Sequence, residues 1–491
     1  MSDRFRRETG RAAAGSGAAE SRALACGGRR AAERERLNQP TTRRRIPGDW
    51  PFNPRRTPFF YGWVIWLFST LGFLMSVPGQ TMGMAVFTDP FIDAFDLSRT
   101  ELSFAYLGGT VTSALFLTRA GRLYDRLGAR IMVAGSALLL GLLVVFISLV
   151  DHIGTALAAV LGLPLAAVTL PAMLIGYFGV RFAGQGVLTS ASRNVLLVWF
   201  ERRRGIVSGA RGVFVSLGFS IAPLLLALMI DDFGWRGALW LMAAVLIFGF
   251  ASLALFFLRD SPASVGLNAD GVSDAVRASA PATAESSKTL HQARLSPSFW
   301  IYSAGLSIHA LFGTAVTFHI VAIFAEAGRD RGEAFGYFLP SAIVSTTVNL
   351  LASWLADRSR LKPFLLVMLS AFLLGTTGLL NLDTAWGYAL LVFGFGAGGG
   401  LWGVISNLAY VRLFGTLHLG EISGLNTALT VMASAIGPFL FSLGFDMSGS
   451  FHGAEWLCGG VIVVLLIAAA LIRQPDDRAP HLALRAVNSS R

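Results

Sequence analysis

The chain has 491 residues, of which 54% are hydrophobic and 14% are charged, and its mean hydropathy is +0.60. Soluble domains average about 25% charged residues, so a soluble protein of this composition could not bury its apolar surface. Intrinsic disorder needs low hydrophobicity and is excluded for all but the ends. Two cysteines, Cys26 and Cys458, are too few for a disulfide scaffold. These exclusions leave a polytopic α-helical membrane protein.

The net charge of +11 is concentrated at the N-terminus, where residues 1–58 hold 14 arginines and 6 acidic residues. A basic tail can bind nucleic acid, but this one precedes a series of apolar runs and lacks the apolar core of a signal peptide. We interpret it as a disordered cytoplasmic arm that follows the positive-inside rule and contacts anionic membrane lipid. Nucleic acid is not expected as a partner.

Apolar runs of spanning length form two groups of six, separated by a polar stretch at residues 259–297. One further segment, residues 153–170, is apolar and nearly long enough to span. The twelve runs cover residues 61–86, 102–120, 131–150, 172–199, 205–230 and 237–258, and then 299–325, 335–356, 363–382, 384–411, 420–445 and 454–472.

The distribution of basic residues indicates the orientation of the spans. With both tails and residues 259–297 in the cytoplasm, the short inner loops and this linker hold 15 basic residues, and the outer loops hold four. An extra span at 153–170 would place Arg202 to Arg204 outside, so we interpret that segment as an outer extension or a re-entrant element. The predicted domains are a tail (1–58), a six-helix half (59–258), a cytoplasmic linker (259–297), a second six-helix half (298–473) and a cytoplasmic C-terminal tail (474–491).

The two halves repeat each other in sequence. The loop Gly121–Arg130 follows the second span, and the similar loop Ser353–Lys362 follows the eighth, with Asp125 aligned to Asp357. A second pair of matching segments lies in spans five and eleven, where Pro223 and Pro438 are each followed by an aspartate after eight residues. The repeat supports twelve spans in two parallel halves.

These motifs resemble the major facilitator superfamily of secondary transporters over about residues 60–473. Gly121–Arg130 matches its signature Gly-x-Leu-x-Asp-Arg-x-Gly-x-Arg, and Arg181–Gly186 is similar to its fourth-span motif. Phe60–Trp63 and Trp199–Gly205 are similar to the monocarboxylate and oxalate/formate group. The resemblance implies an all-α fold of two pseudo-symmetric six-helix halves. That group often carries a charged residue in span eight, where this chain has only Asn349.

Three arginines lie within the spans, Arg181, Arg193 and Arg211, whereas the acidic residues fall in loops, tails or span ends. A buried arginine costs about 2.5–3.5 kcal/mol at a span centre, so each needs a partner. The pattern favours an anion-binding site, because guanidinium groups match carboxylate geometry. The alternative is a structural arginine that binds helix-end carbonyls or extends to the inner face. Gln80 lies at the depth of Arg181, and we expect the two to be in contact.

His309 and His319 lie in span seven, about 80° apart around the helix and about 15 Å apart along it. Histidine titrates near neutral pH, which suits proton coupling. Hydrogen bonding between helices explains them equally well. Two interpretations also apply to Asn349, Asn407 and Asn426, namely substrate contact and hydrogen bonding between helices.

The loop after span two also has a mechanical interpretation. Its aspartate and arginines can join two helix ends at the inner face, and release of that contact would shift the chain between inward-open and outward-open states. The alternative is a tight turn that carries positive-inside charges. The residues that we assign to this latch are Gly121, Asp125, Arg126, Arg130, Asp357 and Arg358.

Gly394–Gly400 contains Gly-x-Gly-x-x-Gly, the pattern of dinucleotide-binding loops. It lies inside an apolar span and not after a strand, so we interpret its small residues as a helix-packing surface. We find no Walker loop, no metal-ligand cluster and no catalytic triad. The sequence therefore predicts no enzyme activity, no cofactor and no metal.

The pattern as a whole predicts a secondary transporter of a small organic anion, a monocarboxylate or dicarboxylate, driven by proton symport or anion exchange. The alternatives are a carrier of a neutral solute or drug and a non-transporting sensor on a transporter fold. We expect a monomer in the bacterial cytoplasmic membrane, with both termini in the cytoplasm.

Overall fold

The structure, a computed structural model, describes residues 47–271 and 287–472. Everything below concerns the unit that begins at Pro47. Most of the predicted N-terminal tail, the middle of the linker and the C-terminal tail lie outside the described residues.

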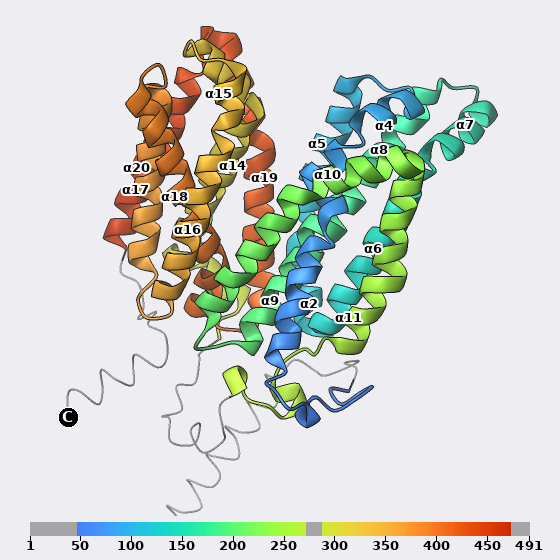
Figure 1. The fold of residues 1–491 in the computed structure, drawn as a ribbon, viewed down its shortest axis with the longest axis vertical. Helices are drawn as coiled ribbons and strands as arrows, with labels where there is room; N and C mark the ends of the chain where they lie inside the picture. Colours follow the sequence, from blue (N-terminus) through green and yellow to red (C-terminus); the bar gives the residue numbers. More distant parts are fainter. Residues whose placement is uncertain (1–46, 272–286, 473–491) are drawn as a thin grey trace, which may run out of the picture. The chain divides into compact units, whose positions relative to one another are not determined.

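The first half of the bundle contains α2 to α11 (Figure 1). Span one is interrupted, because α2 (Gly62–Leu74) is followed by a 3₁₀ turn, η2 (Val77–Gly79), before α3 (Thr81–Ala85) continues it. Span four contains a wide π-helical segment, η3 (Arg181–Leu188). The remaining elements are α4 (Thr88–Phe95), α5 (Arg99–Leu127), α6 (Ala129–Ser148), α7 (Val150–Leu161), α8 (Leu165–Val180), α9 (Thr189–Trp199), α10 (Arg204–Ala244), the π-helical η4 (Val245–Ala251) and α11 (Ser252–Phe257).

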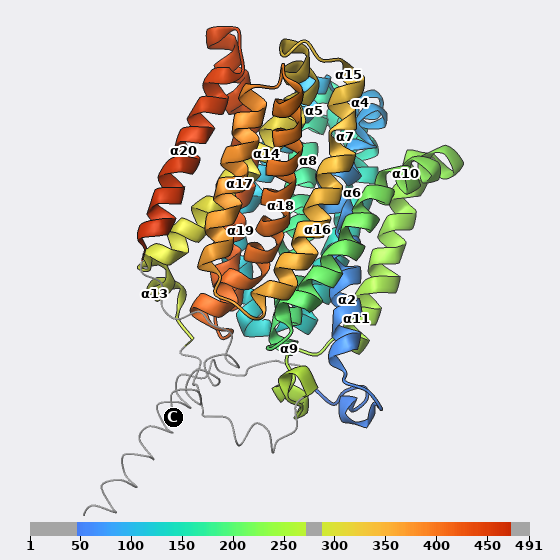
Figure 2. The ribbon, with the colours of Figure 1, turned by 60° about the vertical axis from the view of Figure 1, so that its left-hand side comes forward.

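The second half, α13 to α20 (Figure 2), follows the short 3₁₀ turns η5 (Ala263–Val265) and η6 (Ala269–Gly271). Its helices are more regular than those of the first half. They are α13 (Leu290–Arg294), α14 (Pro297–Glu326), α15 (Arg331–Gly336), α16 (Phe338–Ala356), α17 (Lys362–Leu380), α18 (Ala385–Phe414), α19 (Leu419–Ser448) and α20 (His452–Leu471).

Nine helices among the described residues are long and apolar enough to cross a membrane by length and composition. One of them, Arg204–Phe257, contains two crossings, because Gly234 has a φ of 70° and turns the chain between them. The interrupted span one and the more polar α5 complete the set. The helices therefore form the twelve crossings that the sequence predicts, six in each half.

The apolar segment 153–170 forms no helix of spanning length of its own. Helix α7 has 12 residues, which give about 18 Å of helix, and it packs against α8 and α4. The helix Leu165–Trp199 has 35 residues and is about 52 Å long, well beyond the roughly 30 Å of a bilayer core. The segment is helical, and its assignment as an outer extension or a re-entrant element stays a prediction.

Residues 47–58 belong to the folded unit, and not to a disordered tail as the composition predicts. Arg130 donates hydrogen bonds to the carbonyl oxygens of Pro47 and Trp50, and Arg259 donates to those of Gly48 and Phe52. The segment therefore covers the ends of spans three and six. The composition could not show this boundary, because the contacts use backbone carbonyls of the segment and arginines far away in the chain.

Small residues allow the helices of the second half to pack closely. A side chain on Gly394 of α18 would overlap the backbone of Gly375 of α17, at 2.5 Å from its Cα. A side chain on Gly396 or Gly400 would meet backbone oxygens of α16 at 2.8 and 2.5 Å. The glycine pattern of span ten is therefore a packing surface, as predicted, and it faces two neighbours at once.

We expect Gly394→Ala to destabilise the protein by about 1–3 kcal/mol, because its methyl group collides with backbone that cannot move aside. Gly460→Ala on α20 is the matched control, since nothing lies within 4 Å of a side chain there. Thermal unfolding of the detergent-purified variants measures the effect. Equal melting temperatures for both variants would contradict the packing argument.

Candidate functional site

A cavity of about 340 Å³ lies between the two halves of the bundle. Its walls come from α2, α9 and α10 of the first half and from α16 and α18 of the second. Arginine, asparagine, serine and threonine side chains line it together with Trp402 and Phe73, and no carboxylate does so among the described residues. This volume fits a small organic molecule.

Arg211 of α10 is buried in the wall of this cavity and joins the two halves. Its Nη2 donates to Oδ1 of Asn407 of α18 at 2.7 Å, and its Nη1 lies 3.5 Å from Oγ of Ser69. The guanidinium carbon lies 4.5 Å from the ring centroid of Phe73. The charge is thus held by neutral groups and an aromatic face, and no anion of the described chain compensates it.

Arg193 of α9 lines the same cavity and interacts electrostatically with Arg211 and Tyr410. We find no hydrogen bond or ion pair of its side chain within the described residues. A buried Ser208 hydroxyl without a hydrogen-bond partner also lies in the wall. Two positive charges and an unsatisfied hydroxyl therefore converge on one space.

Arg181 does not line this cavity. It lies within the first half, where Nη1 donates to the Gly79 carbonyl at 3.1 Å and lies 3.4 Å from Oγ1 of Thr81. Its guanidinium carbon lies 5.1 Å from the Tyr106 ring centroid, and its buried Nε has no hydrogen-bond partner.

The expected contact between Arg181 and Gln80 is wrong, although the depth is right. Gln80 Nε2 donates to Oγ of Ser76 at 2.9 Å, and the residues on either side of Gln80 reach Arg181 instead. Gln80 is the N-cap of α3 and has extended backbone, so it lies where span one is interrupted, and the geometry of a continuous helix does not apply to its side chain.

The two histidines of α14 lie in different surroundings. His309 is stacked on Phe372 with ring centroids 4.7 Å apart, lies beside the cavity residue Trp402, and has a buried Nδ1 without a hydrogen-bond partner. His319 Nε2 lies 3.1 Å from the carbonyl oxygen of Pro438, and the hydroxyl of Ser442 lies 3.3 Å away. Of the two, His309 is next to the cavity, whereas His319 joins α14 to α19.

The three asparagines also lie in different surroundings. Asn349 of α16 lines the cavity, and its Nδ2 donates to the Gly400 carbonyl at 2.9 Å. Asn407 lines it as the partner of Arg211. Asn426 instead accepts a hydrogen bond from the buried Tyr410 hydroxyl. Trp402 was not singled out from the sequence, because a tryptophan in an apolar span gives no local signal of the side it faces.

Two aspartates join the halves at the end of the bundle that carries the basic loops, here called the basic end. Asp125 accepts hydrogen bonds from the backbone N–H groups of Gly420 and Glu421 at 2.9 Å each. Asp357 accepts from those of Gly205 and Ile206 at 2.7 and 3.0 Å. Each carboxylate therefore caps the first turn of a helix in the opposite half, α19 or α10. Asp125 and Asp357, which are aligned in the sequence repeat, therefore make equivalent contacts.

Other predicted members of the latch fall into two groups. Gly121 lies against Gly420, where a side chain would overlap the backbone at 2.6 Å from its carbonyl carbon. Arg126 and Arg358 are exposed, and Arg130 bonds within the first half, so these three arginines do not join the halves in this structure. Sequence reasoning missed two charged contacts: Arg122 pairs with Glu421, and Arg412 lies 3.7 Å from Asp357.

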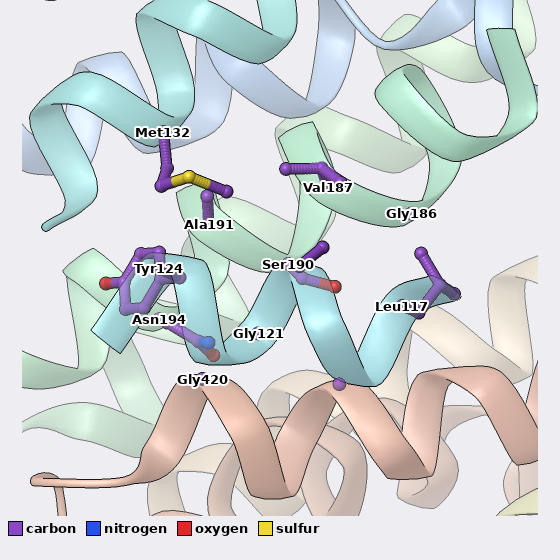
Figure 3. Close-up of a pocket in the computed structure, with 12 residues that line it drawn as sticks. Leu117, Gly121, Tyr124, Met132, Gly186, Val187, Ser190, Ala191, Asn194 and Gly420 are labelled. Atoms are coloured by element: carbon purple, nitrogen blue, oxygen red, sulfur yellow. The ribbon is translucent and has the colours of Figure 1, made fainter. Parts of the chain in front are cut away.

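A small cavity of about 20 Å³ lies behind the Asp125 contact (Figure 3). The figure shows Gly121 and Tyr124 of α5 next to Gly420 of α19, with Asn194 close by. Asn194 Nδ2 donates to Oγ of Ser423 at 3.0 Å, and its buried Oδ1 has no hydrogen-bond partner. The space can hold about one water molecule and is far too small for a solute.

A family model described as Major Facilitator Superfamily matches residues 68–438. No curated protein sequence matches the chain. Solved structures also resemble it, and the three described next are 15–19% identical to it, a level that shows the fold alone.

The fucose:proton symporter FucP of E. coli, in the outward conformation, gives a TM-score of 0.56 at 19% identity, over 85% of this chain and 100% of that chain. The proton:xylose symporter XylE bound to 6-bromo-6-deoxy-D-glucose gives 0.62 at 15%, over 85% and 97%. The human organic anion transporter MFSD10 gives 0.55 at 16%, over 84% and 100%.

We expect Asp125→Asn to lower the free energy needed to open the basic end by about 1.4 kcal/mol or more. This change raises the population of the opened form about tenfold. The test places a cysteine at Ser423, which is 2% exposed here, on a background without Cys26 and Cys458 (Cys26→Ser, Cys458→Ala), and measures its rate of alkylation. Arg126→Gln, in the same loop, is the control. Equal alkylation rates in both variants would show that the carboxylate does not hold the halves together.

Proposed function

The chain belongs to the Major Facilitator Superfamily of membrane transporters, and on that premise we propose that it moves a small organic anion by alternating access. In such a mechanism two halves rock around a site near the middle of the membrane. The cavity between α9, α10, α16 and α18 supports this proposal, because its walls come from both halves.

The observation that carries the proposal is the charge of the cavity. Arg193 and Arg211 share it, and no carboxylate of the described chain lines it. Like charges in a poorly solvated space raise each other's free energy, and an anion lowers it. The planar guanidinium also fits a carboxylate with two parallel hydrogen bonds. A monocarboxylate or dicarboxylate of modest size satisfies these conditions.

The motifs around Phe60–Trp63 and Trp199–Gly205 support the narrower assignment to carriers similar to the monocarboxylate and oxalate/formate group. This chain differs in where the charge resides. Span eight contributes Asn349 to the cavity, whereas the arginines come from α9 and α10 of the first half. In this proposal, therefore, the first half binds the anion, and the second half supplies amides, hydroxyls and Trp402.

The contacts at the basic end support an outward-facing state. The halves are joined there by Asp125 and Asp357, and their ribbons diverge toward the other end (Figure 1). By the positive-inside rule the basic end faces the cytoplasm, in our proposal that of a bacterial cell. The cavity then receives its solute from outside, and breaking the two aspartate contacts opens it inward.

A neutral, hydroxyl-rich solute is the second candidate. The amides of Asn349 and Asn407 and several serine hydroxyls line the cavity beside Trp402. Such groups can bind sugar hydroxyls and stack on a sugar ring. The printed names of FucP and XylE identify those two proteins as sugar symporters.

Arg193→Gln and Arg211→Gln are each expected to abolish anion binding while the protein still folds. The measurement is a thermal-shift panel of carboxylates and sugars on purified protein. A ligand at about 100 times its dissociation constant adds about 2.7 kcal/mol of apparent stability. The control is Arg294→Gln, an exposed arginine outside the cavity.

Stabilisation of the parent protein by one class of carboxylate, lost in both cavity variants and kept in the control, is the expected result. Stabilisation by sugars alone, unchanged in Arg193→Gln, would replace the anion carrier with the second candidate.

For proton coupling we propose His309, because it is the titratable side chain next to Trp402 and has an unsatisfied ring nitrogen. His309→Gln is expected to remove the stimulation of uptake by an inward proton gradient in proteoliposomes and to leave counterflow exchange in place. His319→Gln is the matched control on the same helix. Gradient-stimulated uptake by the His309 variant would exclude this role for His309, whereas a lack of gradient stimulation in the parent protein would favour anion exchange.

A further inference from the structure

A second groove, of about 520 Å³, lies at the basic end, outside the cavity between the halves. One wall is α2 and the first turns of α10, and the other is the end of α16. Trp63, Trp66, Phe214 and Trp354 supply its aromatic surface, and Arg202, Arg203 and Arg358 supply its charge.

The arginine charges of this groove are not neutralised by acidic side chains of the described residues. Among the described residues we find no ion pair for the side chains of Arg202, Arg203 or Arg358, and all three are exposed. Arg358 lies over the Trp354 ring at 4.2 Å. The carboxylate in the wall, Asp357, accepts two backbone N–H groups at the start of α10 and lies near Arg412, so its own charge is compensated.

The apolar part of the groove is open. Trp63, Phe214 and Trp354 are about half exposed, at 48%, 55% and 50%. They belong to spanning helices, so their exposed faces meet acyl chains in a bilayer, and the arginines lie where such a helix reaches the headgroups. A ligand that satisfies both parts carries a negative head and apolar tails.

We propose that this groove binds one anionic phospholipid, with its phosphate between Arg202, Arg203 and Arg358 and its acyl chains along the tryptophans. A free phosphate uses the arginines but leaves the aromatic wall unoccupied, and a soluble partner cannot reach a wall inside the membrane. Because α2 and α10 belong to one half and α16 to the other, a bound lipid bridges the halves at their closed end and favours that state.

The test compares lipid retention by native mass spectrometry of the full-length, detergent-purified protein. Phosphatidylglycerol is the probe, and phosphatidylcholine and inorganic phosphate are the comparison ligands. The groove variant is Arg202→Gln, Arg203→Gln and Arg358→Gln combined. The control variant also removes three exposed arginines, Arg56→Gln, Arg119→Gln and Arg294→Gln, all outside the groove.

We expect about tenfold weaker retention of phosphatidylglycerol in the groove variant or a larger loss, and no change in the control. Equal retention in both variants overturns the proposal, and so does displacement of the lipid by inorganic phosphate, which would indicate a free-anion site. Should the triple variant fail to fold, Trp354→Leu keeps every charge and tests the wall alone. It must weaken phosphatidylglycerol binding for the proposal to stand.

Discussion

The structure depends on two carboxylates that cap helix ends across the boundary between its halves. The first turn of a helix leaves N–H groups without partners, and burying them at an interface is unfavourable. Asp125 satisfies those of α19, and Asp357 satisfies those of α10. All four hydrogen bonds are charge-assisted, so they are strong enough to define a state.

Helices α10 and α16 each carry a residue of the Asp357 contact and a residue of the cavity wall, so they connect this contact to the cavity. Gly205, capped by Asp357, and Arg211 lie less than two turns apart on α10, and Asn349 lies two turns before Asp357 on α16. Arg211 in turn bonds to Asn407 across the halves. A movement that separates the halves at the basic end must therefore also alter this bond, and a solute that takes over Arg211 weakens one of the ties between the halves.

The arginines serve different purposes, although they look alike in the sequence. Arg130 and Arg259 hold the segment at residues 47–58 by its carbonyls, and Arg204 donates to the carbonyls of Leu197 and Phe200. Arg181 braces the interrupted span one. Arg193 and Arg211 face a space between the halves. What distinguishes the last two is the lack of carbonyl partners, which leaves their charge available to a solute.

The sequence by itself determined the two halves of six spans, their internal repeat, and the acid-free core with three arginines, because span length, loop charge and motif spacing are local properties. It also gave Asp125 and Asp357 as equivalent positions. It did not determine which side chains meet. Spans that are apolar all round carry no signal of the face they turn inward.

The tertiary structure decided that Arg193 and Arg211 share a cavity while Arg181 lies elsewhere, that Gln80 bonds to Ser76, and that Arg122 pairs with Glu421 although Arg126 does not. Each of these depends on the rotation of a helix about its axis. That rotation is set by glycines and bulky side chains hundreds of residues apart, as in the approach of Gly121 to Gly420, and no local pattern in the sequence encodes it.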